Sequence, residues 1–198
     1  MMLGRLVLWV CFLIGLSACS NKSYEGDSYL NYPDTDMLLE QYLNNYKKLP
    51  NTFRVVRQSG EKRDTQYLKA NEMPWAELEA PFREAGFFNE KNDKQYRIQV
   101  LHDTLNQRMS LFYQALNEKL FTQKATIQAQ WPSNKVYSMY FECEEKGFFQ
   151  QRHYKLLYAC GKSMQIQKTE SALWSKEKKE IIGVQFLNGS AVPEPVSE

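Results

Sequence analysis

The first apolar pattern along the chain has the period of a helix. It covers residues 35–48, where apolar side chains recur on one broad face. That face consists of Leu38, Leu39, Tyr42, Leu43, Tyr46 and Leu49. Lys47 and Lys48 suit the negative end of a helix, and Pro50 cannot continue one. The pattern therefore predicts a helix that ends before Pro50.

Two further stretches share this period. In residues 74–86 one side carries apolar groups, Gly86 is a natural stop, and Pro81 should kink the helix or split it into two turns. In residues 104–120, apolar groups recur at steps of four, three, four and four, and Thr104 with Gln107 matches a capping box. The apolar positions of this third stretch are Leu105, Met109, Phe112, Leu116 and Leu120.

The rest of the pattern has period two and predicts strands, most of them after Phe121. These segments are 52–57, 95–101, 125–131, 136–143, 154–160, 164–168 and 181–187. The later ones follow one another closely, which is typical of an antiparallel meander with one polar face. We therefore expect an α+β fold in which about three helices pack on one antiparallel meander sheet of about five to seven strands.

Residues 1–18 have the layout of an export signal. A single cation, Arg5, precedes an apolar run from Leu6 to Gly15, which is too short to span a membrane as a stable helix. The tetrapeptide Leu16-Ser17-Ala18-Cys19 then follows. Its aliphatic residue, two small residues and cysteine resemble the lipobox of bacterial lipoprotein precursors. The alternatives are an ordinary signal peptide, or a signal anchor in which Cys19 occurs by chance.

The resemblance implies that residues 1–18 are removed and that Cys19 is lipidated on its thiol and then acylated on its amine, for instance with palmitate. It identifies a targeting class and no activity. Several acyl chains would hold the protein on a membrane, because each buried methylene adds about 0.8 kcal/mol. Ser20 follows the cysteine in place of a retaining aspartate. We therefore expect a protein anchored in the bacterial cell envelope, with the outer membrane facing the periplasm preferred over the inner membrane.

Composition indicates one ordinary globular domain. The 198 residues are 43% hydrophobic and 24% charged, and 25 Lys and Arg against 23 Asp and Glu give a formal charge of +2. This balance argues against a nucleic-acid partner, which would require a concentrated basic surface. We expect the lipidated Cys19 and a flexible tether over 19–33, a single domain over 34–187 and a disordered tail over 188–198.

Two cysteines remain in the expected domain, Cys143 and Cys160. In an oxidising envelope such a pair usually forms a disulfide, and the alternative is two buried thiols. A disulfide requires the two strands to pair around a centre near Gln151 and Arg152, with a wide loop over 144–153 or a break in the second strand, because bridged Cα atoms must lie within roughly 7 Å.

Catalytic and metal-binding motifs are missing from the sequence. Only His102 and His153 are present, and no zinc, phosphate-loop, dinucleotide or serine-hydrolase signature occurs. His102 beside Asp103 could be a base and its orienting group, but neighbours on a strand face opposite sides. The glutamates around Cys143 could bind a cation or a glycan, although an ordinary charged loop accounts for them. We expect no enzymatic activity, no metal and no cofactor.

Aromatic residues crowd the segment 137–158, which we interpret as a hairpin. Because they occupy both faces, those outside the core are either covered by helices or exposed for binding. The candidate surface consists of Tyr137, Tyr140, Phe148 and Tyr154. We therefore expect a non-enzymatic, lipid-anchored protein that docks on an envelope protein as an assembly accessory. The alternatives are a periplasmic ligand-binding or enzyme-inhibitor module, similar to lysozyme inhibitors, and a cell-wall enzyme that uses carboxylates.

Overall fold

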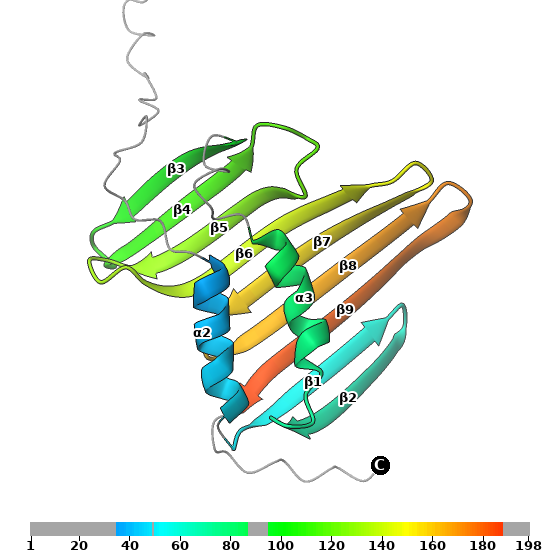
Figure 1. Cartoon of the computed structure of the whole chain (residues 1–198), viewed down its shortest axis with the longest axis horizontal. Coiled ribbons are helices and arrows are strands. Elements are labelled where there is room, and N and C mark those ends of the chain that lie inside the picture. Colours follow the sequence, from blue (N-terminus) through cyan, green and yellow to red (C-terminus); the bar gives the residue numbers. More distant parts are fainter. Residues whose placement is uncertain (1–34, 49, 87–94, 188–198) are drawn as a thin grey trace, which may run out of the picture. The chain divides into compact units, whose positions relative to one another are not determined.

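One antiparallel sheet, which follows the chain order almost throughout, dominates the structure. The computed structural model describes residues 35–48, 50–86 and 95–187, all of which belong to one compact unit. Within them, nine strands pair in the order β2-β1-β9-β8-β7-β6-β5-β4-β3. Strands β3 to β9 form a meander, and β9 then pairs with β1, the first strand of the chain. Two helices lie across one face of this sheet (Figure 1).

The strands differ in length, and the longer ones lie next to one another in the sheet. The shorter ones are β1 (Thr52–Ser59), β2 (Lys62–Lys69), β3 (Tyr96–Asp103), β4 (Arg108–Ala115) and β5 (Thr122–Gln130). The longer ones are β6 (Lys135–Lys146), β7 (Gln150–Ala159), β8 (Ser163–Ala172) and β9 (Ser175–Leu187). The helices are α2 (Thr35–Lys48) and α3 (Trp75–Ala85).

Both helices form where the apolar spacing predicts them. In α2, Leu39 and Leu43 are buried, and the ring of Tyr46 lies 4.8 Å from that of Phe186 on β9. In α3, the chain remains helical through Pro81, so of the two expected outcomes, a kink or a split into two turns, the split does not occur. The indole Nε1 of Trp75 at its start donates a 2.7 Å hydrogen bond to the Ala70 carbonyl.

The core lies between the helices and the inner face of the sheet, the face on which α2 and α3 pack. Strand residues alternate, so every second side chain points to this face. The ring of Phe82 on α3 meets the rings of Phe141 and Tyr158 edge-on, each 6.4 Å away. Phe53 on β1 makes a similar contact, at 5.2 Å, with Trp75. Aromatic packing therefore joins the helices to β1, β6, β7 and β9.

A charged contact ties the two helices to each other. Glu79 is buried on α3, with 6% of its surface exposed. The Lys47 Nζ of α2 lies 2.5 Å from its carboxylate, and Arg83, one turn further along α3, lies 3.2 Å away. Two cations thus compensate one buried carboxylate, as burial of a charge requires.

The predicted fold class is wrong. We expected an α+β fold with about three helices on a sheet of about five to seven strands, whereas the described residues form a nine-stranded sheet with two short helices. The fold is essentially all-β. Two elements account for the difference in the number of helices and strands. One predicted helix is a strand, and one further strand was not predicted.

Residues 104–120 contain β4 instead of the predicted helix. Met109, Leu111 and Tyr113 alternate on the inner face, and β4 pairs with β3 and β5 on either side. The expected cap is a turn in which Asp103 accepts a hydrogen bond from the Asn106 amide and Gln107 has φ 52°. Helical spacing and strand alternation coincide here, and pairing with two neighbouring strands decides in favour of the strand.

Strand β2 was not predicted because it lacks apolar alternation. Its sequence KRDTQYLK leaves every residue except Leu68 exposed. Pairing of Ser59 with Lys62 leaves Gly60 and Glu61 as a two-residue turn, and Gly60 has φ 59°. A glycine with positive φ is what the twist of such a tight hairpin requires.

The predicted disulfide between Cys143 and Cys160 is also wrong, because both thiols are free. Cys143 pairs with Tyr154, so the β6–β7 hairpin turns at Phe148 and Phe149 rather than near Gln151. The Cys160 amide instead bonds to the Tyr137 carbonyl, six residues from Cys143 along β6. Six residues of strand span about 20 Å, well beyond the reach of a disulfide.

Replacing Phe82 should test the contact between helix and sheet. Phe82→Ala removes a buried ring from α3 and should lower the free energy of unfolding by about 3–5 kcal/mol. Leu105→Ala is the control, since Leu105 is 95% exposed and its loss should change stability by less than about 0.5 kcal/mol. Urea unfolding followed by circular dichroism measures both, and equal effects would contradict the packing described.

Alkylation should show two slow, unequal thiols. Burial raises the pKa of Cys143 to about 12 and that of Cys160 to about 11. Because the thiolate reacts, labelling by iodoacetamide should accelerate between pH 8 and pH 10, with Cys160 labelled before Cys143. Peptide mapping after trypsin measures each site, because cleavage after Lys146 separates them. A reducible cross-linked peptide pair would contradict the register.

Candidate functional site

The four long strands β6 to β9 extend past the rest of the sheet. They have 12, 10, 10 and 13 residues, against 8 for each of β1 to β4. Their hairpin turns, β6–β7 and β8–β9, lie side by side at one end of the sheet (Figure 1). The Leu173 amide of one turn donates a 3.3 Å hydrogen bond to the Phe149 carbonyl of the other.

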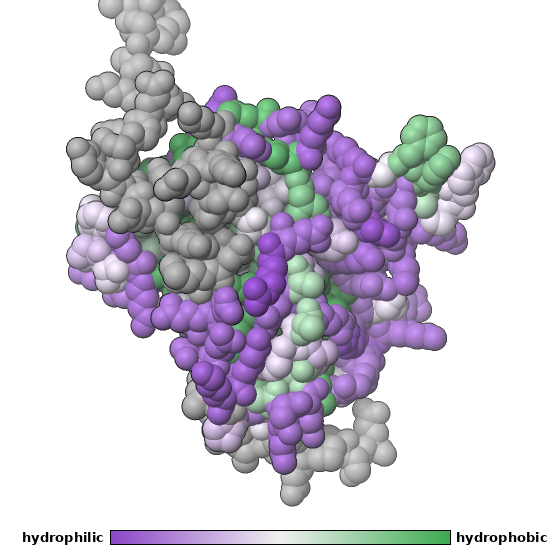
Figure 2. Space-filling model, viewed as in Figure 1, coloured by the Kyte–Doolittle hydropathy of each residue, from purple (hydrophilic) through white to green (hydrophobic). Residues whose placement is uncertain are grey.

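These two turns carry an exposed apolar surface, which we call the hairpin-tip patch. It consists of Phe148, Phe149, Leu173 and Trp174, which are 88%, 63%, 69% and 93% exposed. The rings of the two phenylalanines pack edge-on at 4.6 Å. Figure 2 shows these apolar groups projecting from surroundings that are mostly hydrophilic. Large apolar groups gathered and exposed in this way indicate a binding surface.

Local sequence places the patch at the turns. The Gly147 amide donates a 2.8 Å hydrogen bond to the Gln150 carbonyl, and a Cβ on Gly147 would lie 2.9 Å from that oxygen. A side chain would therefore disturb the β6–β7 turn. In the other hairpin, Ala172 pairs with Ser175, so Leu173 and Trp174 are the two turn residues. Positions that usually hold Asn-Gly hold two large apolar residues here.

Ion pairs support the patch on the inner face. Arg152 on β7 lies between Glu145 on β6, at 3.1 Å, and Glu170 on β8, at 3.2 Å. Lys168 adds a contact of 3.6 Å to Glu170. The hydrogen bond from Arg152 lowers the pKa of Glu170, so this carboxylate stays charged at neutral pH. Charged pairs thus replace the apolar core below the turns.

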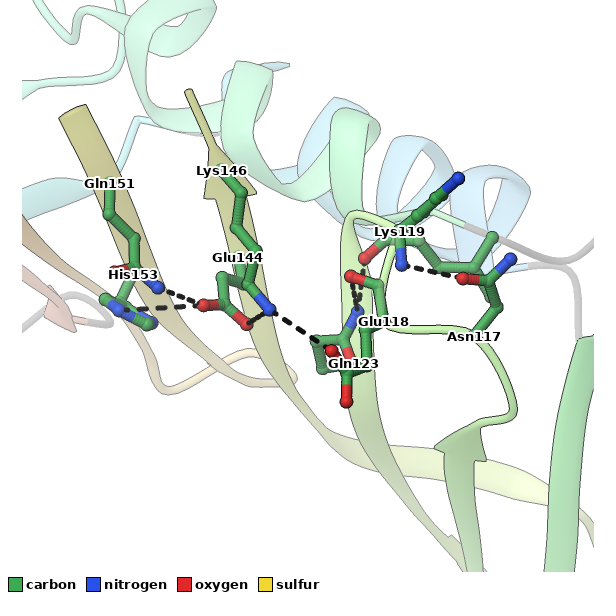
Figure 3. A network of polar contacts seen from close by, with 9 residues as sticks. Asn117, Glu118, Lys119, Gln123, Glu144, Lys146, Gln151 and His153 are labelled. Carbon is green, nitrogen blue, oxygen red and sulfur yellow. Dashed lines mark hydrogen bonds and ion pairs between the residues drawn. The ribbon is translucent and has the colours of Figure 1, made fainter. Parts of the chain in front are cut away.

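The opposite, outer face of the same strands carries a second polar network (Figure 3). Glu144 accepts a hydrogen bond from the Gln151 side chain and lies 3.4 Å from Lys146 and 3.9 Å from His153. Lys146 also lies 3.8 Å from Glu118 in the β4–β5 loop. Both faces are polar below the patch, so the apolar turns are not an extension of the core.

The structure does not bring the four predicted surface residues together. Phe148 belongs to the hairpin-tip patch. Tyr140 points to the outer face, where its hydroxyl donates a 2.9 Å hydrogen bond to Glu142, and burial together with this bond raises its pKa to about 12. Tyr154 points to the inner face and packs against Phe121 at 5.8 Å. Tyr137 lies at the irregular start of β6, where its carbonyl accepts the Cys160 amide.

Other candidates for chemistry are dispersed. His102 packs edge-on against Trp131 at 4.9 Å, at the end of the sheet where β3 meets its turn, far along the chain from His153 on β7. Among residues 35–48, 50–86 and 95–187, no three His, Cys, Asp or Glu side chains converge as a metal site. Neither described helix is long and apolar enough to cross a membrane. The predicted Cys19 and residues 1–18, 19–33 and 188–198 lie outside the described residues.

A shallow hollow of about 370 Å³ lies where α3 begins beside β1, β2 and β9. Its side next to α3 is occupied by an ion pair, since Arg57 binds Glu77 through two hydrogen bonds of 2.7 and 2.9 Å. This pairing raises the pKa of Arg57 and lowers that of Glu77. Arg57 and Glu77 therefore neutralise each other and are not available to a charged ligand in this hollow.

Sequence reasoning missed three of the four patch residues. Phe148 was named from the crowding of aromatics, but Phe149, Leu173 and Trp174 were not. The available signal was the occurrence of Leu-Trp between two strand patterns, where Gly, Asn or Asp would be expected. An apolar pair at a turn is more costly in water than a polar pair, so its presence points to binding.

Removing the patch should leave the fold intact. The double change Phe148→Ser and Trp174→Ser alters two side chains that are 88% and 93% exposed, so the melting temperature should shift by less than about 2 °C. Retention on a hydrophobic-interaction column should fall clearly. Leu101→Ser with Leu116→Ser is a matched control, since these exposed residues lie outside the patch and should affect retention less. Equal effects would contradict a localised surface.

Comparisons with known proteins identify no relative in sequence. No protein-family model matches the chain, and no curated protein matches it. Among solved structures, a match is found to the S-type phycobiliprotein lyase CPES from Guillardia theta, at 7% identity and a TM-score of 0.23. The alignment covers 78% of this chain and 94% of the lyase. Such a TM-score does not establish a shared fold, so the geometry itself must support any functional argument.

Proposed function

We propose that this chain is a non-enzymatic, lipid-anchored protein of the bacterial cell envelope, which docks on an envelope protein through the hairpin-tip patch. The observation that carries the proposal is the exposure of four large apolar side chains on two adjoining turns. Their burial against a partner would remove apolar surface from water, the main driving force of association.

The shape of the patch suggests the kind of partner. The side chains project from turns and are not sunk in a groove, so the complementary surface is a concave apolar pocket. Trp and Phe at the centre of such a contact supply most of the binding energy in protein interfaces. The backbone ladder between β7 and β8 holds the two hairpins together, and the ion pairs of Arg152 with Glu145 and Glu170 lie across it, so little order has to be gained on binding.

The sequence of the first residues supports the location. The lipobox-like Leu16-Ser17-Ala18-Cys19 would place the anchor at Cys19, and residues 19–33 would connect it to the domain. A flexible segment of that length reaches on the order of 20 Å from the membrane. A domain on such a tether would search only a thin layer of the envelope, which raises its effective concentration for a partner in the same membrane.

Crosslinking in intact cells tests the proposal. A photoactivatable residue at position 174 of the full chain should give one major crosslinked envelope protein, whereas the same residue at position 105 should not. Leu105 is an equally exposed control, at 95% against 93% for Trp174. Intact mass of the purified protein would report acylation at Cys19 separately.

The double change Phe148→Ser and Leu173→Ser should reduce the crosslinked product at least tenfold, with unchanged amounts of protein in the membrane fraction. Equal crosslinking from positions 174 and 105, or a product that survives the double change, would overturn the docking proposal. A mass without acyl groups would overturn the anchor and leave the docking result standing.

A further inference from the structure

On the outer face of β2, β1, β9 and β8, cations outnumber acids, and the acid that strand alternation places outward is Glu177 near the β8–β9 turn. The register places four positive side chains outward on these strands, namely Arg54, Arg63, Lys69 and Lys179. No Asp or Glu occupies an outward register position between them. The outward residues nearest to Arg54 are uncharged, namely Val56, Ser163, Gln165, Gly183 and Gln185.

Three acids of the same strands, Asp64, Glu170 and Glu180, point to the inner face. Asp64 lies opposite Arg57, and Glu180 lies opposite Lys168 and 2.7 Å from Lys178. These inward acids therefore have basic neighbours. Within the part of the chain that the structure describes, none of the four outward cations forms an ion pair. A chain with a formal charge of only +2 thus presents one face of uncompensated positive charge.

A glycine lies near the middle of this face. Gly183 sits inside β9, between Val56 on β1 and Gln165 on β8. A Cβ built on it would meet no atom within 4 Å, and its φ is not in the left-handed range. Neither the backbone nor the packing requires a glycine here, although glycine weakens a strand. A glycine inside a strand often marks a bulge, a tight bend, or a close approach by a ligand or another backbone, and the register of β9 is continuous at Gly183, without a bulge.

The missing side chain helps to leave a hollow of about 390 Å³. Its floor and walls are formed by Arg54, Val56, Lys162, Ser163, Met164, Gln165, Gly183, Val184 and Gln185. The Arg54 Nε is buried there, and within the described residues it has no hydrogen-bond partner. A buried donor without a partner costs free energy, which the Arg54 side chain would recover by turning toward an anion in the hollow.

The lining indicates the class of ligand. Arg54 and Lys162 supply positive charge with no carboxylate among the lining residues, and a guanidinium fork matches a carboxylate or a phosphate. Gln165, Gln185 and Ser163 offer donors and acceptors suited to hydroxyl groups. The volume lies in the range of small-ligand sites. We propose that this hollow binds an anionic sugar, a saccharide bearing a carboxylate or a phosphate, through Arg54.

Titration followed by 15N-1H correlation NMR tests the proposal on the full chain purified in detergent. The probes are glucuronate and glucose 6-phosphate, with glucose and inorganic phosphate as the uncharged and sugar-free controls. We expect saturable shifts of the Gly183 amide, the Arg54 Nε–H and the Gln185 side-chain amide with at least one acidic sugar. The probe that binds more tightly shows whether the site takes carboxylate or phosphate.

Two changes in the hollow separate binding from folding. Gly183→Val fills the space and adds a residue that favours strands, so it should abolish the saturable shifts while keeping or raising the melting temperature. Arg54→Gln should weaken binding at least tenfold. Lys69→Gln removes an outward cation that does not line the hollow, and should change the dissociation constant by less than twofold.

Three results would overturn the proposal. If neither acidic sugar caused saturable shifts, the hollow would not be a binding site for this class of ligand. Undiminished binding by Gly183→Val, or equal losses from Arg54→Gln and Lys69→Gln, would show a general attraction of anions to the face. Inorganic phosphate binding as tightly as both sugars would remove the saccharide from the proposal. The hairpin-tip patch takes no part in these measurements, so its docking role stands or falls independently.

Discussion

Among the described residues, two short helices cover the inner face of a nine-stranded sheet. The rest of the structure depends on how much of that face they cover. Trp75 at the start of α3 packs against Phe53, and Phe82 further along packs against Phe141 and Tyr158. Tyr46 of α2 adds the contact to β9. Where these aromatic contacts exist, the strands can be apolar on one face, because that face is removed from water.

Beyond the part that the helices cover, the same strands are polar on both faces. The extensions of β6 to β9 have nothing apolar to pack against, so their inner face changes to the ion pairs of Arg152 and their outer face to the network around Glu144. Exposed pairs of this kind contribute little stability each, and the backbone ladder holds the extension together. Against this polar stem, the apolar turns at Phe148 and Trp174 add no buried side chain to the core. A binding role explains them better than folding does.

The sequence predicted the parts of the fold in which a single period is unambiguous. Both helices and most strands were predicted correctly. Buried residues such as Leu43 in α2 belong to an apolar pattern with the period of a helix, and those such as Leu156 in β7 belong to one with the period of a strand. Around Met109, helical and strand periods coincide, and only the neighbouring strands decide between them. Pairing register is equally invisible in one sequence, so the disulfide prediction failed and three of the four patch residues were missed.

The hollow on the outer face could not be predicted from the sequence either, because its charge depends on the strand register. The net charge follows from composition. The face to which each charged side chain points depends on the strand register and on which face of the sheet the helices cover. Shifting β9 by one residue would move Glu180 outward and Lys179 inward, and the cationic face would lose its character. Gly183 is visible in the sequence as a glycine inside a strand pattern, but its neighbours Val56 and Gln165 come from distant segments. The meander that builds the core therefore also gathers, on one face, four cations that form no ion pair among the described residues.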